Sequence, residues 1–580
     1  MTSESWETLE TDVLIVGSGG AGLCAALHLA DAPRPPRVLM AVKGLFGKSG
    51  CTRMVQGGYN VVLNPADSLE KHFLDTIKGG QWINNQELAW QLVQEAPARV
   101  LELENRAGCF FDRDATGHIH QKAFAGQSFD RTVHKGDLTG IEIINRLSEQ
   151  VIAAENTTVL EEVRAVDLLL DAGGTAVVGA LLLNIRTGRF IVAHARATLL
   201  ATGGGPTMYK ISAPCHEKSC DGMAMAWRTG APLMDMEMVQ FHPTGLLVAD
   251  KLISGTVLEE GLRGAGGYLK NALGERFMHK YDERGERATR DIVSRSCFIE
   301  IMEGRGTPEG GVLLDASHLG ADFVLNNFRG MSLRCKDVGY DLTTGPVLIS
   351  PTAHFMMGGV PIDTHCRTEF EGLFVAGEDA AGVHGANRLG GNGVAESTVY
   401  GGIAGDAIAQ WVHEAPRHAV QERQVGALID RACAPFANEP ARSVYPLRDR
   451  LRDVMWRKAG LVRDQQGLTD AEAELAALRE ELARAGCPAG RTFNMAWMDW
   501  LNLENYLDVS GAIVRSALGR RESRGSHFRS DFPERNDAQF LCNLLITRED
   551  AGPIHQAIDF SRVKPDHPEI YSRFEPQQTP

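Results

Sequence analysis

The pattern Gly17-x-Gly19-x-x-Gly22 constrains the fold of this chain more than any other feature of its sequence. It follows an apolar, strand-like run at residues 12–16 and precedes an apolar, helix-like run at 23–30, and a second strand-like run covers 37–42. In such a strand–turn–helix unit the glycines let the backbone approach a pyrophosphate, to which the helix N-terminus offers free N–H groups. The pattern predicts a Rossmann-like α/β domain that binds a dinucleotide, but alone it does not distinguish FAD from NAD.

Two further glycine clusters follow strand-like runs much later in the chain. Gly203-Gly204-Gly205 comes after residues 197–201, and Gly377 comes after residues 372–376. Glycine allows close backbone approach, so three such units far apart in sequence indicate one large ligand held by several loops. The strand at 37–42 ends in Val42-Lys43, without the acidic residue that normally holds an adenosine ribose.

Length, charge and cysteine usage exclude several classes of protein. A chain of 580 residues is too long for one compact core, so several domains are expected. No apolar run reaches about 18 residues, and the polar, acidic N-terminus is unlike a signal peptide. The net charge of −15 argues against nucleic acid as a partner and requires a local positive cluster for any anionic substrate. The 11 cysteines form no Cys-x-x-Cys pair, which argues against zinc or an iron–sulfur cluster in this chain alone and favours reduced thiols in the cytoplasm.

The composition of the sequence changes along the chain and predicts its domains. Residues 240–354 carry mixed helices with many Arg and Glu and several His, which indicates a domain inserted into the nucleotide-binding domain. The two parts of that binding domain are then 1–239 and 355–440. Helical periodicity dominates 441–545, and the tail at 546–580 is rich in Pro and charge, so we expect it to wrap a surface.

A small set of polar residues is suited to binding a dicarboxylate. The set consists of Arg290, Arg388, His242, His354 and Thr244. An arginine guanidinium matches a carboxylate in two hydrogen bonds, and histidine and threonine can complete a second anion site. Holding both carboxylates would position the substrate for reaction, and positioning of this kind can lower a barrier by roughly 7–11 kcal/mol.

Motifs spread over residues 11–545 carry a resemblance to a known family. They are Gln56-Gly57-Gly58, His72-x-x-Asp75-Thr76-x-x-Gly79-Gly80, Ala201-Thr202-Gly203-Gly204, Asp221-Gly222-Met223-Ala224, Phe241-His242-Pro243-Thr244-Gly245, Glu260-Gly261-x-Arg263-Gly264, Arg290-Asp291, Pro351-Thr352-Ala353-His354, His384-Gly385-Ala386-Asn387-Arg388-Leu389-Gly390 and Glu522-Ser523-Arg524-Gly525-Ser526-His527. Through these motifs the chain resembles the flavoprotein subunits of fumarate reductases and succinate dehydrogenases, to which L-aspartate oxidase is a sister. The resemblance implies FAD, a capping domain of α+β type at 240–354, and an enzyme that interconverts fumarate and succinate, or a close C4-dicarboxylate, by hydride transfer at flavin N5.

The resemblance also implies roles for single residues. His242 and Thr244 would bind one carboxylate, and His354 and Arg388 the other. Arg290 would donate or accept the proton, with Glu260 and Arg263 as its relay. The residues implied to hold FAD are Gly17, Gly19, Gly20, Ala21, Gly22, Lys43, Ser49, Gly50, Cys51, Thr52, Gln56, Gly57, Gly58, Thr202, Gly203, Asp221, Glu378, Arg388 and Asn392.

The attachment of FAD is expected to be non-covalent. Relatives with covalent flavin carry a histidine shortly before the glutamine that corresponds to Gln56. Here Gly50 and Cys51 occupy that region, and no histidine lies between Lys43 and Gln56. A cysteinyl link through Cys51 is the alternative. Since a covalent link raises the flavin potential in such enzymes, its absence favours fumarate reduction or a different electron partner.

A second function stays open beside the first. An L-aspartate oxidase, which also binds FAD without a covalent bond, reads the substrate amine with an acidic residue in the loop that corresponds to residues 124–127. Phe124 stands there in this chain and cannot pair with an ammonium group, which favours a plain dicarboxylate. Gly393 replaces a serine that relatives usually carry near the flavin ring. We expect the electron partner to be an iron–sulfur protein, and we expect a cytoplasmic location, peripheral to the inner face of the membrane through that partner.

Overall fold

A parallel sheet with the strand order β18-β11-β2-β3-β7 forms the base of the dinucleotide motif. The computed structural model describes residues 6–249, 253–550 and 552–566. The strands of this sheet are β2 (Val13–Val16), β3 (Val38–Val42), β7 (Thr157–Glu161), β11 (Ala197–Leu200) and β18 (Leu373–Val375). All except β7 are buried along their whole length, because helices and other strands cover both faces of a parallel sheet. The α/β fold expected from the glycine motif is therefore confirmed.

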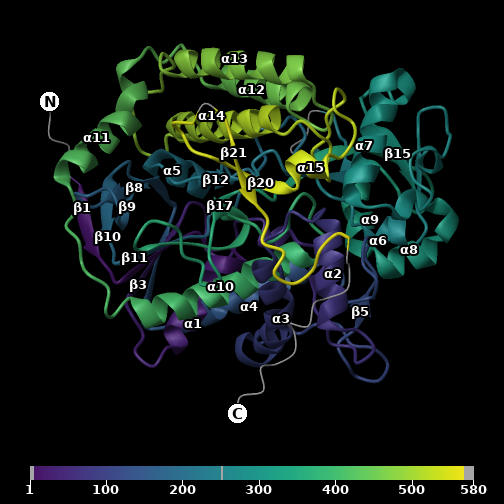
Figure 1. The fold of residues 1–580 in the computed structure, drawn as a ribbon, viewed down its shortest axis with the longest axis horizontal. Coiled ribbons are helices and arrows are strands. Elements are labelled where there is room, and N and C mark those ends of the chain that lie inside the picture. Colours follow the sequence, from purple (N-terminus) through teal and green to yellow (C-terminus); the bar gives the residue numbers. More distant parts are fainter. Residues whose placement is uncertain (1–5, 250–252, 551, 567–580) are drawn as a thin grey trace.

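A group of helices, which begins with the helix after the first glycine loop, packs on one side of this sheet. The helices are α1 (Gly20–Asp31), α2 (Leu69–Gly79), α3 (Gln86–Glu102), α4 (Thr139–Ala153) and α10 (Asn392–Trp411), seen in the lower half of Figure 1. Helix α10 packs tightly along α1, since a Cβ on Gly401 would lie 2.4 Å from the carbonyl oxygen of Ala21. The short strands β4 (Tyr59–Asn60), β5 (Gln121–Lys122) and β6 (Thr132–Val133) pair beside these helices.

A second sheet with the order β1-β10-β9-β8 adjoins the first. It contains β1 (Glu7–Glu10), β8 (Val163–Leu170), β9 (Val177–Asn184) and β10 (Phe190–His194). Strands β8, β9 and β10 lie between the first two glycine clusters of the sequence, and β1 precedes both. Helix α5 (Asp221–Thr229) follows the second glycine cluster and packs on β8, which carries the chain back toward the glycine loops.

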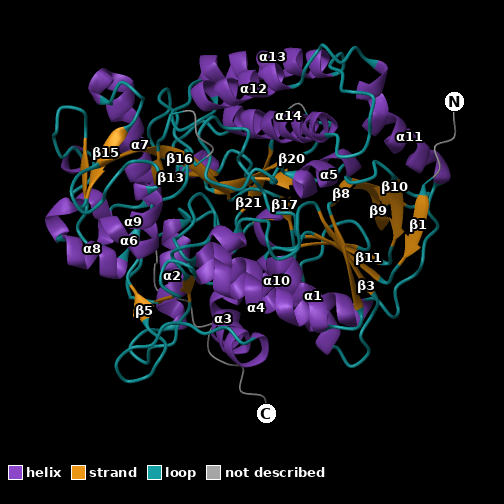
Figure 2. Ribbon diagram, turned by 180° about the vertical axis from the view of Figure 1, so that it is seen from behind, coloured by secondary structure: helices purple, strands orange, loops and turns teal. Residues whose placement is uncertain are grey.

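The region between β13 (Val239–Leu246) and β16 (Val347–Met356) has a core of its own. These two strands join β14 (Tyr268–Lys270) and β15 (Val312–Asp315) in the order β13-β16-β15-β14. Helices α6 (Gly261–Gly264), α7 (Arg290–Glu300), α8 (Ala321–Asn327) and α9 (Arg329–Lys336) pack around them. The region stands to one side of the molecule, and its apolar cluster draws on residues from Leu246 to Ile349 (Figure 2). This agrees with an inserted unit.

Long helices near the C-terminus close the opposite side of the molecule. They are α11 (Glu422–Cys433), α12 (Tyr445–Lys458), α13 (Gln465–Leu482) and α14 (Met495–Gly519), followed by the single turn α15 (Asp537–Phe540). Asp464 and Asn494 cap α13 and α14 by accepting backbone N–H groups, which fixes where these helices begin. In Figure 1, α12, α13 and α14 lie above the sheets, away from α1 and α10. No helix in the described part of the chain is long and apolar enough to cross a membrane.

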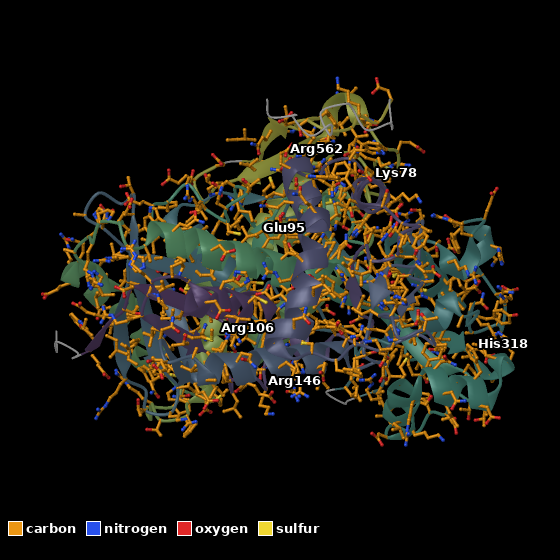
Figure 3. The ribbon with its side chains drawn as sticks, turned by 90° about the horizontal axis from the view of Figure 1, so that it is seen from below. Lys78, Glu95, Arg106, Arg146, His318 and Arg562 are labelled. Atoms are coloured by element: carbon orange, nitrogen blue, oxygen red, sulfur yellow. The ribbon has the colours of Figure 1, made fainter. Side chains whose placement is uncertain are left out.

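The last described segment packs on the helical face and adds a strand that the sequence did not predict. Strand β20 (Cys542–Ile546) pairs with β12 (Leu233–Met234) and with β21 (Ile554–Ala557), while β17 (Val360–Pro361) pairs with β19 (Ala380–Ala381). Beyond β21, Val563 is buried beside α2 and α3, and Arg562 forms an ion pair with Glu87 of α3. Figure 3 shows Arg562 close to the end of α2 marked by Lys78. Of the tail expected at 546–580, residues 546–550 and 552–566 are described and make these contacts, while 551 and 567–580 lie outside the described residues.

Candidate active site

One cavity brings the three glycine loops and the candidate substrate residues together. Its wall includes Gly17, Gly203 and Gly377 from the three loops. Further along, the same cavity is lined by Arg290, Arg388, His242, His354, Glu260 and Phe124. Residues separated by hundreds of positions in sequence therefore share one space that can hold a long ligand and a small one in contact with it.

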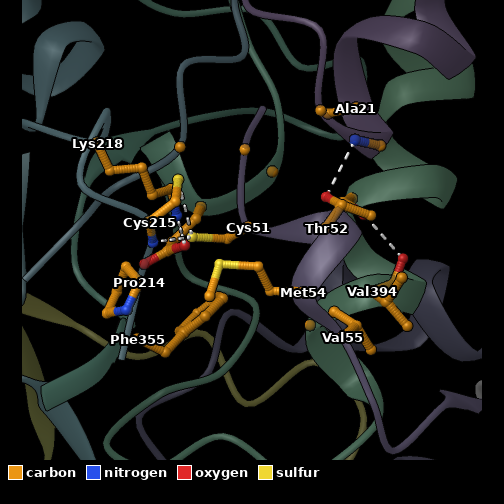
Figure 4. Close-up of a pocket in the computed structure, with 18 of the residues that line it drawn as sticks. Ala21, Cys51, Thr52, Met54, Val55, Pro214, Cys215, Lys218, Phe355 and Val394 are labelled. Carbon is orange, nitrogen blue, oxygen red and sulfur yellow. Dashed lines mark hydrogen bonds and ion pairs between the residues drawn. The ribbon is translucent and has the colours of Figure 1, made fainter. Parts of the chain in front are cut away.

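The first glycine loop leaves the N-terminus of α1 open toward the cavity. Gly17 has φ +109°, and a Cβ there would lie 2.2 Å from the carbonyl oxygen of Ala201, so only glycine fits. Gly19 precedes the helix without a side-chain cap, and the Gly20 N–H donates to Thr52 Oγ1 at 3.1 Å. An uncapped helix start lined by glycines fits the pyrophosphate of a dinucleotide. Figure 4 shows Thr52 between Ala21 and Val394.

Lys43 and Asp221 face each other at one end of the cavity. Lys43 Nζ donates to Asp221 Oδ2 at 2.9 Å and to Asn502 Oδ1 at 2.8 Å, and Arg164 donates to Asp221 Oδ1 at 2.9 Å. Burial lowers the pKa of Lys43 to about 8. Burial alone would raise the pKa of Asp221, but the charges on Lys43 and Arg164 outweigh it and hold the pKa below its usual value. Asp221 is thus an ionised acceptor at this end of the cavity.

The second and third glycine loops are tied to each other beside the cavity. Asp379 accepts hydrogen bonds from the backbone N–H groups of Thr202 and Gly203, at 2.6 and 3.0 Å. Glu378 forms a buried ion pair with Lys218, a lining residue that the sequence analysis did not identify. Lys218 fills the space beside Gly203, where a Cβ would lie 2.5 Å from its Cε. The only sequence signal for Lys218 is its position just before the Asp221 motif.

The loop from Ser49 to Gly58 forms another part of the cavity wall. Seven predicted cofactor residues of this loop line the cavity: Ser49, Gly50, Cys51, Thr52, Gln56, Gly57 and Gly58. Gln56 Nε2 donates to the carbonyl of Val257 at 3.0 Å, which ties the loop to the inserted unit. Gly57 leaves room for the Phe124 ring, whose Cζ would lie 2.4 Å from a Cβ at that position. Phe124 therefore contributes an apolar surface to the cavity.

At the inserted unit, two arginines share one glutamine. Arg290 Nη1 and Arg388 Nη2 donate to Gln240 Oε1 at 3.2 and 3.1 Å, and all three side chains are buried. Burial, followed by the charge on Arg290, lowers the pKa of Arg388 to about 9. Arg388 Nε is buried without a hydrogen-bond partner among the described residues. Two buried guanidinium groups this close favour an anion between them. Gln240, directly before the Phe241 motif, was missed.

Glu260 holds Arg290 from the other side. Arg290 Nε and Nη2 lie 2.9 and 2.8 Å from Glu260 Oε2, and Arg263 Nη2 donates to Glu260 Oε1 at 3.1 Å. Burial would raise the pKa of Glu260, but Arg290 and Arg263 outweigh it and keep the pKa below its usual value. Arg263 does not line the cavity and lies behind Glu260. The three residues expected as a relay are therefore a continuous chain of hydrogen bonds.

Two histidine rings lie side by side near the arginines. The ring centres of His242 and His354 are 5.4 Å apart. Removal from water, and then the charges of the nearby arginines, hold the pKa of both rings well below the usual value, so both are neutral. The backbone N–H of Thr244 approaches His242 Nδ1 at 3.3 Å, which makes Nδ1 the acceptor and leaves the proton on Nε2.

Three expected contact residues do not line the cavity. The Thr244 hydroxyl donates to the carbonyl of Leu258 at 2.7 Å, and its backbone N–H contacts His242 Nδ1. Asn392 Nδ2 donates to Thr76, and its Oδ1 lies 3.1 Å from His72 Nε2, which turns the amide away. Gly22 serves packing, since a Cβ there would lie 2.0 Å from the carbonyl oxygen of Gly17.

Two family profiles and several known proteins match this chain. The profile "FAD binding domain" matches residues 12–394, and "Fumarate reductase flavoprotein C-term" matches 448–579. A chain of the fumarate reductase (CoM/CoB) of Methanothermobacter marburgensis is 42% identical over 549 residues, covering 94% of this chain and 98% of that protein. A "Succinate dehydrogenase flavoprotein subunit" of Coxiella burnetii is 35% identical over 567 residues, covering 93% and 94%. A point variant of E. coli quinol fumarate reductase FrdA has a similar structure, with TM-score 0.92, 31% identity and coverage of 96% and 98%.

Proposed function

Because the chain belongs to the family of FAD-dependent fumarate reductase and succinate dehydrogenase flavoproteins, we propose that the cavity is where it interconverts fumarate and succinate. The observation that carries the proposal is the Arg290–Gln240–Arg388 arrangement, with the neutral His242 and His354 beside it. This arrangement concentrates positive charge at one end of the cavity. The other end of the cavity fits a dinucleotide. A C4-dicarboxylate is the small anion that such an end would hold in two places.

The residues that line the cavity fit FAD. The N-terminus of α1 and Thr52 would hold the pyrophosphate, Asp221 the adenosine ribose, and Glu378 with Lys218 the ribityl chain. The bound flavin supplies the two-electron hydride chemistry that no side chain here can provide. We propose that it is bound without a covalent link, because no histidine lies between Lys43 and Gln56.

The side chains that line this end of the cavity would each contact a different part of the substrate. The His242 Nε2–H donates to one carboxylate, and Arg388 with His354 holds the other. Gln240 fixes both arginine forks at one acceptor, so the planar groups cannot turn away from the bound dianion. Phe124 excludes water from the apolar middle of the substrate and offers no carboxylate for an amine.

Arg290 would deliver the proton during fumarate reduction. One Nη–H proton would pass to the substrate carbon, which leaves Arg290 neutral. Glu260, once protonated by way of Arg263, would then return a proton to Arg290. An isolated arginine is a poor shuttle because its pKa exceeds about 12. Arg388 is linked to Arg290 through Gln240, so a second guanidinium group lies beside the proposed proton donor.

The fold also supports proposals about organisation and partners. We assign 1–239 and 355–440 to the FAD-binding domain, 240–354 to the capping domain, 441–545 to the helical domain and 546–580 to the tail, because a separate apolar cluster fills the inserted region. An iron–sulfur subunit would exchange electrons with the flavin, since the similar chains are subunits by name. We propose a cytoplasmic location, at the inner face of the membrane through that partner, on the likeness to quinol fumarate reductase.

Turnover with different substrates tests this function. The purified FAD-loaded chain should reduce fumarate anaerobically with a reduced dye and should form no peroxide from aspartate in air. The absence of fumarate turnover despite bound FAD would overturn the proposal. Peroxide formation from aspartate would assign the chain to the aspartate oxidase branch and show that Phe124 does not exclude an amine.

A further inference from the structure

Two cysteines from opposite walls of the cavity meet beside Lys218. Cys51 begins the turn at Thr52–Met54, and Cys215 lies in the loop between β11 and α5. Their sulfur atoms are 3.7 Å apart, and the backbone N–H of Cys215 donates to Cys51 Sγ at 3.3 Å (Figure 4). Both side chains line the cavity and keep partial exposure. Among the described residues no other pair of cysteine sulfurs is recorded in such contact.

The surroundings of Cys51 favour the thiolate. The hydrogen bond from the Cys215 thiol, together with the charge of Lys218 and against the effect of burial, lowers the pKa of Cys51 to about 7. The same hydrogen bond, which the Cys215 thiol donates to Cys51, and burial together raise the pKa of Cys215. Cys51 is thus the nucleophile, and Cys215 keeps its proton until it attacks in turn. This asymmetry, with a nearby cation and partial exposure, is typical of reactive cysteines and not of inert buried ones.

We propose that Cys51 and Cys215 are a redox-active dithiol that closes reversibly to a disulfide by exchange with a small disulfide compound. The Cys51 thiolate attacks one sulfur of the compound, forms a mixed disulfide and releases the first thiolate. Cys215 then loses its proton, attacks Cys51 Sγ and releases the second. The two cysteines are oxidised, the compound is reduced to two thiols, and the proton of Cys215 and any proton of Cys51 pass to solvent or to the leaving thiolates.

The position of the pair gives the bond a structural consequence. A disulfide needs an S–S distance of about 2.05 Å, so the two sulfurs, which are 3.7 Å apart, must approach further. The bond would join the wall that carries Thr52, the acceptor of the Gly20 N–H, to the loop that leads to Asp221. It would also remove a negative charge beside Lys218. The redox state of the pair would therefore act on the part of the cavity that holds FAD.

Peptide mapping of the FAD-loaded full-length chain tests the pair directly. After incubation with oxidised glutathione, the expected result is the loss of two titratable thiols, one peptide pair linked through Cys51 and Cys215, and full reversal by dithiothreitol. Cys51→Ser should trap no link, and Cys215→Ser should stop at the Cys51 mixed disulfide. The matched control Cys433→Ser, which changes a partly exposed cysteine outside the cavity, should leave the link intact.

The wild-type chain alone can overturn the proposal, so folding of the variants does not limit the test. Cys51 that carries only glutathione, or two thiols that remain unmodified across the range of glutathione redox buffers, would show that the sulfurs do not close. The measurement contains no dicarboxylate. Failure of fumarate turnover and failure of the disulfide are therefore independent results.

Discussion

At the scale of single residues, Gln240 and Glu260 explain how two arginines can be buried in one cavity. Gln240 Oε1 accepts from both guanidinium groups, and Glu260 neutralises Arg290. One net positive charge, held by Arg388, remains without a carboxylate contact. A buried uncompensated charge is costly, so the cavity favours an anion that would pair with Arg388. The pocket thus favours the binding of an anion at a cost to the stability of the folded chain.

The role of Arg290 is tested by Arg290→Lys. We expect the chain to fold and retain FAD, while fumarate turnover falls by a factor of about 10²–10⁴, because an ammonium group cannot bridge Glu260 and Gln240 and present a proton at once. Steady-state kinetics and the flavin absorbance measure the two properties. Arg305→Lys, a change in an ion pair with Glu300 in the same region, is the control and should keep normal turnover. Near-normal turnover in Arg290→Lys would contradict the assignment.

At the scale of elements, the start of α1 depends on contacts that only glycine permits. Gly17 connects β2 to the helix with a positive φ, and its Cα faces the backbone of β11. The sheet order puts β11 directly beside β2, so two of the three glycine loops emerge next to each other at the carboxyl ends of their strands. The first loop is therefore a contact between strands as well as a ligand loop.

Gly17→Ala should abolish FAD retention. The added Cβ would lie 2.2 Å from the carbonyl oxygen of Ala201 and would also disfavour φ +109°, so the loop must move away from the cavity. The flavin-to-protein absorbance ratio after gel filtration measures the loss. Gly426→Ala in α11, where nothing lies within 4 Å of the added atom, should keep FAD and gain up to about 1 kcal/mol of stability. Retention of FAD by Gly17→Ala would show that the loop adapts.

The contact between α2 and the start of α10 should make stability depend on pH. Burial, and then the charge on Arg131, lowers the pKa of His72 to about 4, so the folded chain keeps it neutral where the unfolded chain protonates it. Its contribution is complete above the unfolded pKa of about 6.5 and is lost as the pH falls from about 6.5 toward about 4.

His72→Gln removes this titration. The stability difference between wild type and variant should shrink by about 2 kcal/mol between about pH 7 and pH 5. Urea unfolding at both pH values measures it. A difference that stays constant would mean that His72 is protonated in the folded chain. His318→Gln, which makes the same substitution at an exposed histidine of the inserted unit, is measured beside it as the control.

At the scale of the whole molecule, a buried arginine fastens the C-terminal segment to the centre. Arg520 is fully buried and contacts Glu237, Asp235 and Glu522, and its guanidinium also donates to the carbonyl of Cys542 at 3.0 Å. Through these contacts the end of α14, β20 and the chain before β13 form one unit. The C-terminal region therefore supports the strand that carries His242.

Arg520→Met tests this connection. Removing the cation leaves several buried carboxylates without their partner, so we expect a loss of about 3–5 kcal/mol in the free energy of unfolding. Thermal and urea unfolding provide the measurement. Arg521→Met, which changes the exposed neighbour, should have an effect within about 0.5 kcal/mol. Equal effects of the two substitutions would show that the buried network contributes little.

The α/β fold, the family and FAD were predictable because they depend on local patterns. Each of these patterns can be recognised from a few consecutive residues: the Gly17 motif, the strand-like runs, and the Phe241 and Arg388 motifs. Lys218 and Gln240 were missed because their importance comes from neighbours distant in sequence, Glu378 and Arg388. Thr244 and Asn392, which the resemblance implied as ligand contacts, hydrogen bond to Leu258 and to His72 and Thr76 and do not line the cavity, a placement that no local pattern shows.

What the sequence by itself determined is which chemistry the chain carries: a dinucleotide loop, two arginines and two histidines in recognisable motifs. The physical reason is that glycine geometry and strand–helix periodicity are properties of short segments. Only the tertiary structure decided which of these groups share the cavity, which stand behind it, and that Cys51 and Cys215 face each other across it. Those relations depend on how β2, β11 and β18 align in the sheet and on where the inserted unit packs, and no local pattern encodes them.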